Sequence, residues 1–123
     1  MRQRKGRGKV TYSKPILDYL VETYHPDALL VYGSFADGSA NAGSDFDALV
    51  IADRPKAHDA SVVDGTVLDV FVYPLEAFRG DYDPEEYLQV FDGEILLDRS
   101  GLAAQLQERV RDYLARKPMK SDE

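Results

Sequence analysis

Residues 28–50 read ALLVYGSFADGSANAGSDFDALV, and this stretch decides the fold of the chain. An apolar run leads into a Gly-Ser pair, a loop of small residues follows, and Asp45 and Asp47 then open a second apolar run. Each run has the length and composition of a buried strand. Because successive side chains of a strand point to opposite faces, the two aspartates should share one face of a sheet, roughly 7 Å apart.

Periodicity and turn signals predict the remaining elements. Residues 56–62 are ambiguous, whereas Thr66–Tyr73 follows an Asp-Gly turn, is rich in β-branched and aromatic residues and should be a strand. The first predicted helix is capped by Ser13, has Val21 on its apolar side and ends at His25-Pro26, and a short helical turn is predicted over residues 35–38. A second helix should begin at Asp83-Pro84, with Tyr87, Leu88 and Phe91 on its apolar side. A short strand from Glu94 to Leu97 and a last helix from about Leu102 to Arg116 complete the predicted elements. This order of elements predicts an α/β (α+β) domain.

The composition is that of a globular protein. With 123 residues, of which 44% are hydrophobic and 30% charged, the chain is long enough for one hydrophobic core. No apolar run approaches the roughly 20 residues of a membrane-spanning helix, and the N-terminus lacks the apolar segment of a signal peptide. The absence of cysteine excludes disulfides and thiolate metal sites. These features favour a cytoplasmic protein.

Charge is distributed unevenly along the chain. The net charge is −7, yet residues 1–14 contain six Lys or Arg and no acidic residue, which leaves the rest of the chain at −13. We therefore expect a basic flexible tail over 1–14, a folded domain over 15–116 and a polar tail over 117–123. The acidic domain is a poor surface for polyanions. The basic tail could contact nucleic acid or could serve only as a solubilising arm.

A third carboxylate joins the first two. Asp69 lies in the middle of the strongest predicted strand, where a charge is costly to bury without a partner. If that strand pairs beside residues 46–52, Asp69 can join Asp45 and Asp47 around one cation, since neighbouring carboxylates otherwise repel. Three carboxylates form a hard oxygen site suited to Mg²⁺ or Mn²⁺. Such a site suits phosphoryl or nucleotidyl transfer, in which Asp69 could help to deprotonate an acceptor hydroxyl.

The Gly33-Ser34 turn is suited to phosphate binding. Glycine lets the backbone approach closely, and the serine hydroxyl with neighbouring N–H groups can donate to phosphate oxygens. A calcium loop is the nearest alternative, because polar residues alternate over 37–41. That alternative fails, since Ala42 and Ala48 occupy the positions where such a loop has glycine and glutamate.

Other polar residues give weaker signals. His25 and His58 have no partner motif and should be surface residues, while most of the eight tyrosines should pack in the core or at an interface. Arg54, Lys56 and Arg79 are possible phosphate contacts, but nothing in the sequence separates them from solvated charges.

The order Gly33-Ser34, a ten-residue gap, Asp45-x-Asp47 and a later Asp69 resembles the nucleotidyltransferase superfamily of DNA polymerase beta. Residues 33–50 are especially similar to minimal nucleotidyltransferases, which include antitoxins paired with HEPN-domain toxins. The resemblance implies a polymerase-beta-like fold, a small mixed sheet flanked by helices. It also implies catalytic metal ligands at Asp45, Asp47 and Asp69, and nucleotide contacts at Gly33, Ser34 and Ser44.

The resemblance leaves the acceptor open. It implies a Mg²⁺- or Mn²⁺-dependent transfer of AMP, or another nucleoside monophosphate, from ATP or another nucleoside triphosphate to a hydroxyl group. The chain is too short for the second helical domain of larger members, so recognition should use a HEPN-type partner protein, a homodimer or a shallow open site. A small molecule such as an aminoglycoside and a nucleic-acid end are alternative acceptors. A non-catalytic antitoxin that acts by binding alone is the alternative from a different functional class.

Overall fold

The computed structural model describes residues 14–33 and 45–116 of the chain. The predicted cap at Ser13 and the predicted helical turn over residues 35–38 lie outside these ranges, as does the polar tail. No helix within the described ranges is long and apolar enough to cross a membrane.

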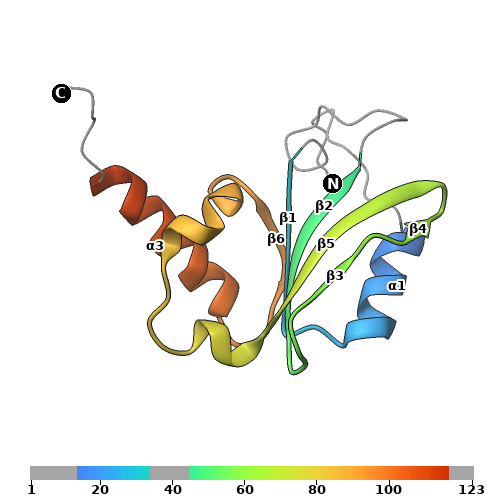
Figure 1. The fold of residues 1–123 in the computed structure, drawn as a ribbon, viewed down its shortest axis with the longest axis horizontal. Helices are drawn as coiled ribbons and strands as arrows, with labels where there is room; N and C mark the ends of the chain where they lie inside the picture. Colours follow the sequence, from blue (N-terminus) through green and yellow to red (C-terminus); the bar gives the residue numbers. More distant parts are fainter. Residues whose placement is uncertain (1–13, 34–44, 117–123) are drawn as a thin grey trace, which may run out of the picture.

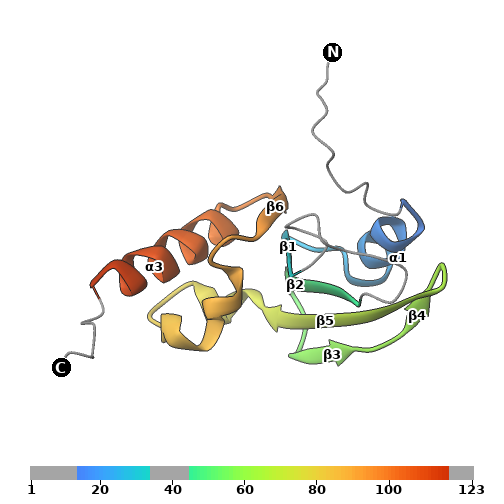
Figure 2. The same cartoon turned by 90° about the horizontal axis from the view of Figure 1, so that it is seen from above.

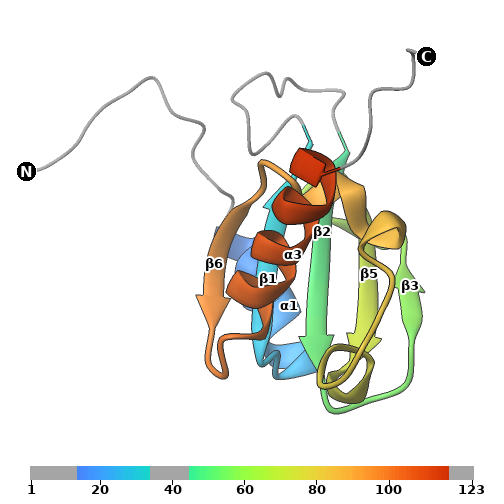
Figure 3. The same ribbon diagram turned by 90° about the vertical axis from the view of Figure 1, so that its left-hand side faces the viewer.

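A mixed sheet with the strand order β3-β5-β2-β1-β6 forms the centre of the domain (Figure 3). Its strands are β1 (Ala28–Tyr32), β2 (Phe46–Ala52), β3 (Ala57–Asp59), β4 (Val62–Val63), β5 (Thr66–Pro74) and β6 (Glu94–Asp98). Neighbouring strands in this order are antiparallel, except that β2 and β5 run parallel. β4 adds an antiparallel hairpin to β5. As a result, β2 and β5 both begin at the edge of the sheet where β1 ends.

Helices cover both faces of this sheet (Figures 1 and 2). On one face packs α1 (Lys14–Tyr24), whose Ile16 and Leu20 are fully buried. The other face is covered by the 3-10 helices η1 (Leu75–Phe78) and η2 (Pro84–Val90) and by α3 (Leu102–Arg116). Side chains alternate between the two layers along β2: Phe46, Ala48, Val50 and Ala52 pack on the α1 side, and Leu49 and Ile51 on the α3 side.

The predicted α/β class is confirmed, as a mixed sheet flanked by helices. The two apolar runs of the opening segment are β1 and β2, and the last helix has the predicted bounds. The Asp-Gly turn joins β4 to β5, with positive φ at both Asp64 (55°) and Gly65 (76°). The ambiguous residues 56–62 contain the short strand β3 and the first residue of β4.

The helix predicted at Asp83-Pro84 begins there but is not a regular α-helix. Asp83 Oδ1 accepts a hydrogen bond from the Glu85 N–H at 3.0 Å, as a capping residue should. The following residues form a 3-10 helix with a non-helical φ of −128° at Tyr87. The kink lets both Tyr87 and Val90 reach the core, where both are buried.

Two apolar residues expected on buried faces are exposed instead. Phe91 follows the end of η2, is 44% exposed and lies beside the Arg111 guanidinium. Val21 is 45% exposed, and the buried residues of α1 are Ile16 and Leu20 alone. Apolar spacing alone therefore overestimated the buried surface of both segments.

Candidate active site

The parallel pairing of β2 and β5 places Asp47 and Asp69 side by side. The two residues are register partners in the sheet. Both lie on the face that carries α3, because Leu49 and Tyr73, an even number of residues along the same strands, pack on that side. The Asp69 side chain is 42% exposed, so the pair opens to solvent. The sequence predicted that these carboxylates would lie together if the two strands pair, and the structure shows that pairing.

Asp45 is less closely integrated. It lies one residue before β2 and is exposed, although it is near enough for its charge to act on Asp47. Over residues 14–33 and 45–116, no three His, Asp or Glu side chains are grouped closely enough to hold a metal ion. The predicted nucleotide contacts Ser34 and Ser44 lie outside the described residues. The described part of the chain thus brings together a carboxylate pair, with Asp45 at its edge.

The electrostatics of this pair fit a divalent cation. Burial raises the pKa of the Asp47 carboxyl to about 6, and hydrogen bonding to Asp69 together with the charges of Asp69 and Asp45 adds to the effect. Two carboxylates this close are compatible only when a proton or a cation lies between them. Oxygen donors alone suit Mg²⁺ or Mn²⁺. The residues present therefore fit such an ion, with Asp45 as a candidate third ligand.

Gly33 follows β1 directly, and its backbone lies against Asp47. Its φ is +75°, a conformation that residues with a Cβ rarely adopt. A Cβ at this position would also collide with Asp47 Oδ2. Both constraints require glycine. The turn that the sequence predicts for phosphate therefore begins beside the carboxylate pair.

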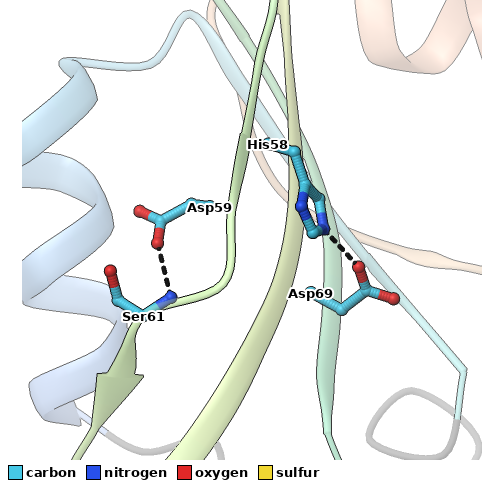
Figure 4. A network of polar contacts seen from close by, with 4 residues as sticks. All are labelled: His58, Asp59, Ser61 and Asp69. Carbon is cyan, nitrogen blue, oxygen red and sulfur yellow. Dashed lines mark hydrogen bonds and ion pairs between the residues drawn. The ribbon is translucent and has the colours of Figure 1, made fainter.

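His58 is a neighbour of the pair that the sequence did not reveal. It lies on β3, and its Nε2 is 2.6 Å from Asp69 Oδ1 (Figure 4). The imidazole also packs on the Phe71 ring, with 4.5 Å between centroids. At 44% exposure it is a surface residue, as expected, but it has a partner. The missing signal was β3 itself, whose three residues are too few to show a strand pattern.

Tyr32, the last residue of β1, flanks the pair on its other side. It is the register partner of Asp47 and is only 8% exposed. Burial raises the pKa of its phenol to about 12; the charges of Asp47 and Asp69 act in the same direction, and a hydrogen bond with Gln89 opposes them. The phenol is therefore neutral at physiological pH and adds no negative charge to the site.

Two of the cations considered for phosphate binding, Arg54 and Lys56, lie at the other end of the sheet. Arg54 follows the far end of β2, so roughly 20 Å of extended chain separates it from Asp47. Its Nη1 donates to the Thr23 carbonyl at 2.9 Å. Lys56 lies over the Tyr73 ring, near the end of β5. Neither residue contributes to this site.

Comparison with known families gives the class of protein to which this fold and site belong. The nucleotidyltransferase domain family matches residues 14–120, and the chain belongs to this family. Among solved structures, a mutant form of the toxin–antitoxin MntA-HepT is similar in fold, with a TM-score of 0.53 and 17% sequence identity over 85% of this chain and 88% of that chain. The likeness is to the MntA antitoxin. No match is found among curated proteins.

Proposed function

We propose that this protein is a divalent-metal-dependent nucleotidyltransferase that moves AMP from ATP to a hydroxyl group on a partner protein. The observation that carries the proposal is the register pairing of Asp47 with Asp69 beside the Gly33 turn. Membership of the nucleotidyltransferase family supports the reaction type. The likeness in fold to the antitoxin of a toxin–antitoxin complex supports a HEPN-type partner as the acceptor.

The proposed reaction assigns a task to each described residue. The acceptor oxygen attacks the α-phosphorus of ATP, the bond from that phosphorus to the bridging oxygen of the β-phosphate breaks, and pyrophosphate leaves. Asp47 and Asp69 would hold Mg²⁺ or Mn²⁺, and Asp45 would complete the site as a third ligand. The chemistry that such an ion would supply is neutralisation of the charge on the triphosphate and on the leaving pyrophosphate. Asp69 Oδ2, the oxygen that does not contact His58, accepts the proton of the acceptor hydroxyl.

The donor phosphates are assigned to the turn after β1. Gly33 has no side chain to obstruct an approach to Asp47, and its positive φ turns the chain away from the strand. Ser34 and Ser44, at the two ends of the following segment, are proposed to donate hydroxyl hydrogen bonds to the triphosphate. The Tyr32 phenol lines the same site and stays uncharged.

The test is transfer of label from ATP to a candidate acceptor. The full chain is incubated with Mg²⁺ and a HEPN-type protein encoded in the same genome, using ATP labelled at either the α- or the γ-phosphate. The proposal expects the acceptor to retain α-label but not γ-label, and its mass to rise by that of an adenylyl group, which is AMP less one water. Asp47→Asn should abolish labelling, whereas Asp53→Asn, an exposed aspartate beyond the far end of β2, should leave it intact.

Two other outcomes would replace this function. If the wild-type chain binds the HEPN-type protein tightly but never labels it, the protein acts as an antitoxin by binding alone. If γ-label is retained instead, the reaction is phosphoryl transfer. Persistence of α-labelling in Asp47→Asn would remove the carboxylate pair from the mechanism.

A further inference from the structure

We propose that His58 is a positioning residue, which holds the Asp69 carboxylate in the orientation needed to bind the cation. The proposal rests on the proposed function, because it takes Asp69 as a ligand. Its basis is the contact of 2.6 Å between His58 Nε2 and Asp69 Oδ1, made from a strand outside the family motif.

The geometry of the sheet explains the contact. β3 pairs antiparallel with β5, with His58 opposite Phe71 and Asp59 opposite Val70. Asp69 is thus the diagonal neighbour of His58 on the same face, a separation that long and aromatic side chains can bridge. A carboxylate only accepts hydrogen bonds, so Nε2 is the donor. Oδ1 is occupied in this way, and Oδ2 is the oxygen that does not contact His58.

The other face of β3 is tied down by a separate contact network. Asp59 is 7% exposed, and its Oδ2 accepts hydrogen bonds from the hydroxyl groups of Tyr19, at 2.6 Å, and Tyr24. Its Oδ1 accepts from the Ser61 N–H at 2.9 Å, as Figure 4 shows. Because adjacent residues of a strand point to opposite faces, anchoring Asp59 against α1 directs His58 toward Asp69.

Asp69 needs such support because of its surroundings. Its side chain is 42% exposed, and the neighbouring carboxylate of Asp47 repels it when both are ionised. A free side chain would rotate toward solvent. A donor on the side away from Asp47 offsets that repulsion and fixes the rotamer. Residues that hold a metal ligand by hydrogen bonding typically change metal affinity or activity about 10- to 100-fold when they are removed.

Two substitutions separate the hydrogen bond from the ring. His58→Gln keeps an N–H donor at nearly the same reach but loses the imidazole ring. His58→Phe keeps an aromatic ring on Phe71 but has no donor. Residue 58 is exposed, so neither change buries a polar group. Thermal unfolding of each variant without metal checks that the fold is intact.

The primary measurement is Mn²⁺ binding to the full chain in the presence of ATP, followed by the electron paramagnetic resonance signal of free Mn²⁺. We expect His58→Phe to weaken Mn²⁺ binding about 10-fold or more, and His58→Gln to stay within about 3-fold of wild type. In the label-transfer assay, His58→Phe should lower kcat, with rescue in His58→Gln. This rescue distinguishes a positioning bond from general packing.

Three other results for the variants overturn the proposal. If His58→Phe binds Mn²⁺ as wild type does, the contact is an ordinary surface hydrogen bond with no effect on the metal site. Tighter binding by His58→Phe means that the imidazole competes with the cation. If Phe preserves binding and Gln loses it, the ring rather than the hydrogen bond matters. Failure of the wild-type protein itself to bind Mn²⁺ and ATP counts instead against the proposed function.

Discussion

Gly33 and Asp47 are in contact at the edge of the sheet: the space that a Cβ on residue 33 would need is filled by the Asp47 carboxylate. The turn after β1 and a candidate metal ligand are therefore one structural unit. The same residue also has a φ of +75°, so its conformation and its proximity to Asp47 impose the same choice of amino acid.

Replacing Gly33 with alanine should damage both stability and ligand binding. The positive φ alone should cost about 1–2 kcal/mol of unfolding free energy. The collision with Asp47 Oδ2 should add to that cost and displace the carboxylate. We expect Gly33→Ala to lose most of the rise in melting temperature that Mg²⁺ and ATP give to the wild-type protein, measured by thermal unfolding with and without both ligands.

Gly65→Ala is the matched control for this prediction. Gly65 has nearly the same φ, +76°, but a Cβ there meets nothing within 4 Å. Gly65→Ala should therefore lower the melting temperature through backbone strain and still respond fully to Mg²⁺ and ATP. An equal loss of ligand response in both variants would show that the contact between Gly33 and Asp47 does not contribute to ligand binding.

Asp47→Asn should stabilise the metal-free protein at high pH. The pKa of Asp47 is raised from 3.8 to about 6 in the folded state, so the folded protein holds this proton more tightly than the unfolded chain. Its favourable contribution is complete below about pH 4 and is lost as the pH rises through about 6. Asparagine does not titrate and removes the repulsion.

Thermal unfolding in a chelator across pH 4.5 to 8 measures this effect, with Asp53→Asn as the control. The stability of Asp47→Asn relative to wild type should grow as the pH rises through about 6, by roughly the few degrees that correspond to about 1 kcal/mol. Addition of Mg²⁺ and ATP should reverse the order, because only the wild type binds them. A difference in melting temperature between Asp47→Asn and wild type that does not change with pH would contradict the raised pKa of Asp47.

Asp59→Asn should weaken the attachment of β3 to α1. Burial by itself raises the pKa of Asp59, but hydrogen bonds from Ser61, Tyr19 and Tyr24 outweigh it and lower the pKa to about 2. This carboxylate therefore stabilises the fold fully above about pH 4, and the contribution is lost as the pH falls through about 2. Near neutral pH the substitution should cost about 1.5–3 kcal/mol, the usual worth of hydrogen bonds to a charged group.

Urea unfolding at pH 7 and pH 3 tests the role of Asp59. The difference between wild type and Asp59→Asn should be smaller at pH 3. Asp53→Asn should differ little from wild type at either pH, since Asp53 is exposed. A cost that stays constant down to pH 2 would mean that the loss comes from packing and not from the ionised carboxylate.

Gln107 should be essential for holding η2 against α3. It is 8% exposed, and its Nε2 donates to the carbonyl oxygens of Val90 at 2.9 Å and Gly93 at 2.7 Å. Gln107→Leu leaves these carbonyls without that donor and should lower the unfolding free energy by about 1–3 kcal/mol in urea. Gln105→Leu, on the exposed side of the same helix, should change it by less than about 0.5 kcal/mol.

Sequence patterns located the long elements of this fold because each carries its own signal. β1, β2 and β5 are continuous apolar or β-branched runs, and Asp69 is conspicuous within one of them. β3 has no such pattern, since Ala57, His58 and Asp59 become a strand only through pairing with β5. The contact between His58 and Asp69 depends on that register and could not be read from either residue alone.

η2 shows a second limit of sequence patterns. Its cap at Asp83 is a local feature and was predicted correctly. The kink at Tyr87 is set by the core, where the ring packs edge-on against Tyr73, Phe78 and Tyr82. Tertiary packing of this kind overrides the helical spacing that placed Phe91 on the buried side.

The position of Asp69 in β5 also disfavours a misfolded state in which β2 and β5 pair in a shifted register. A slip of one residue would set Leu68 or Val70 beside Asp47 and turn Asp69 into the apolar layer against Ile16 and Leu20. An unpaired carboxylate in that layer would be costly enough to disfavour the slipped state. Asp69 thus disfavours misalignment of β5, because a chain with the shifted register is less stable and cannot assemble the carboxylate pair.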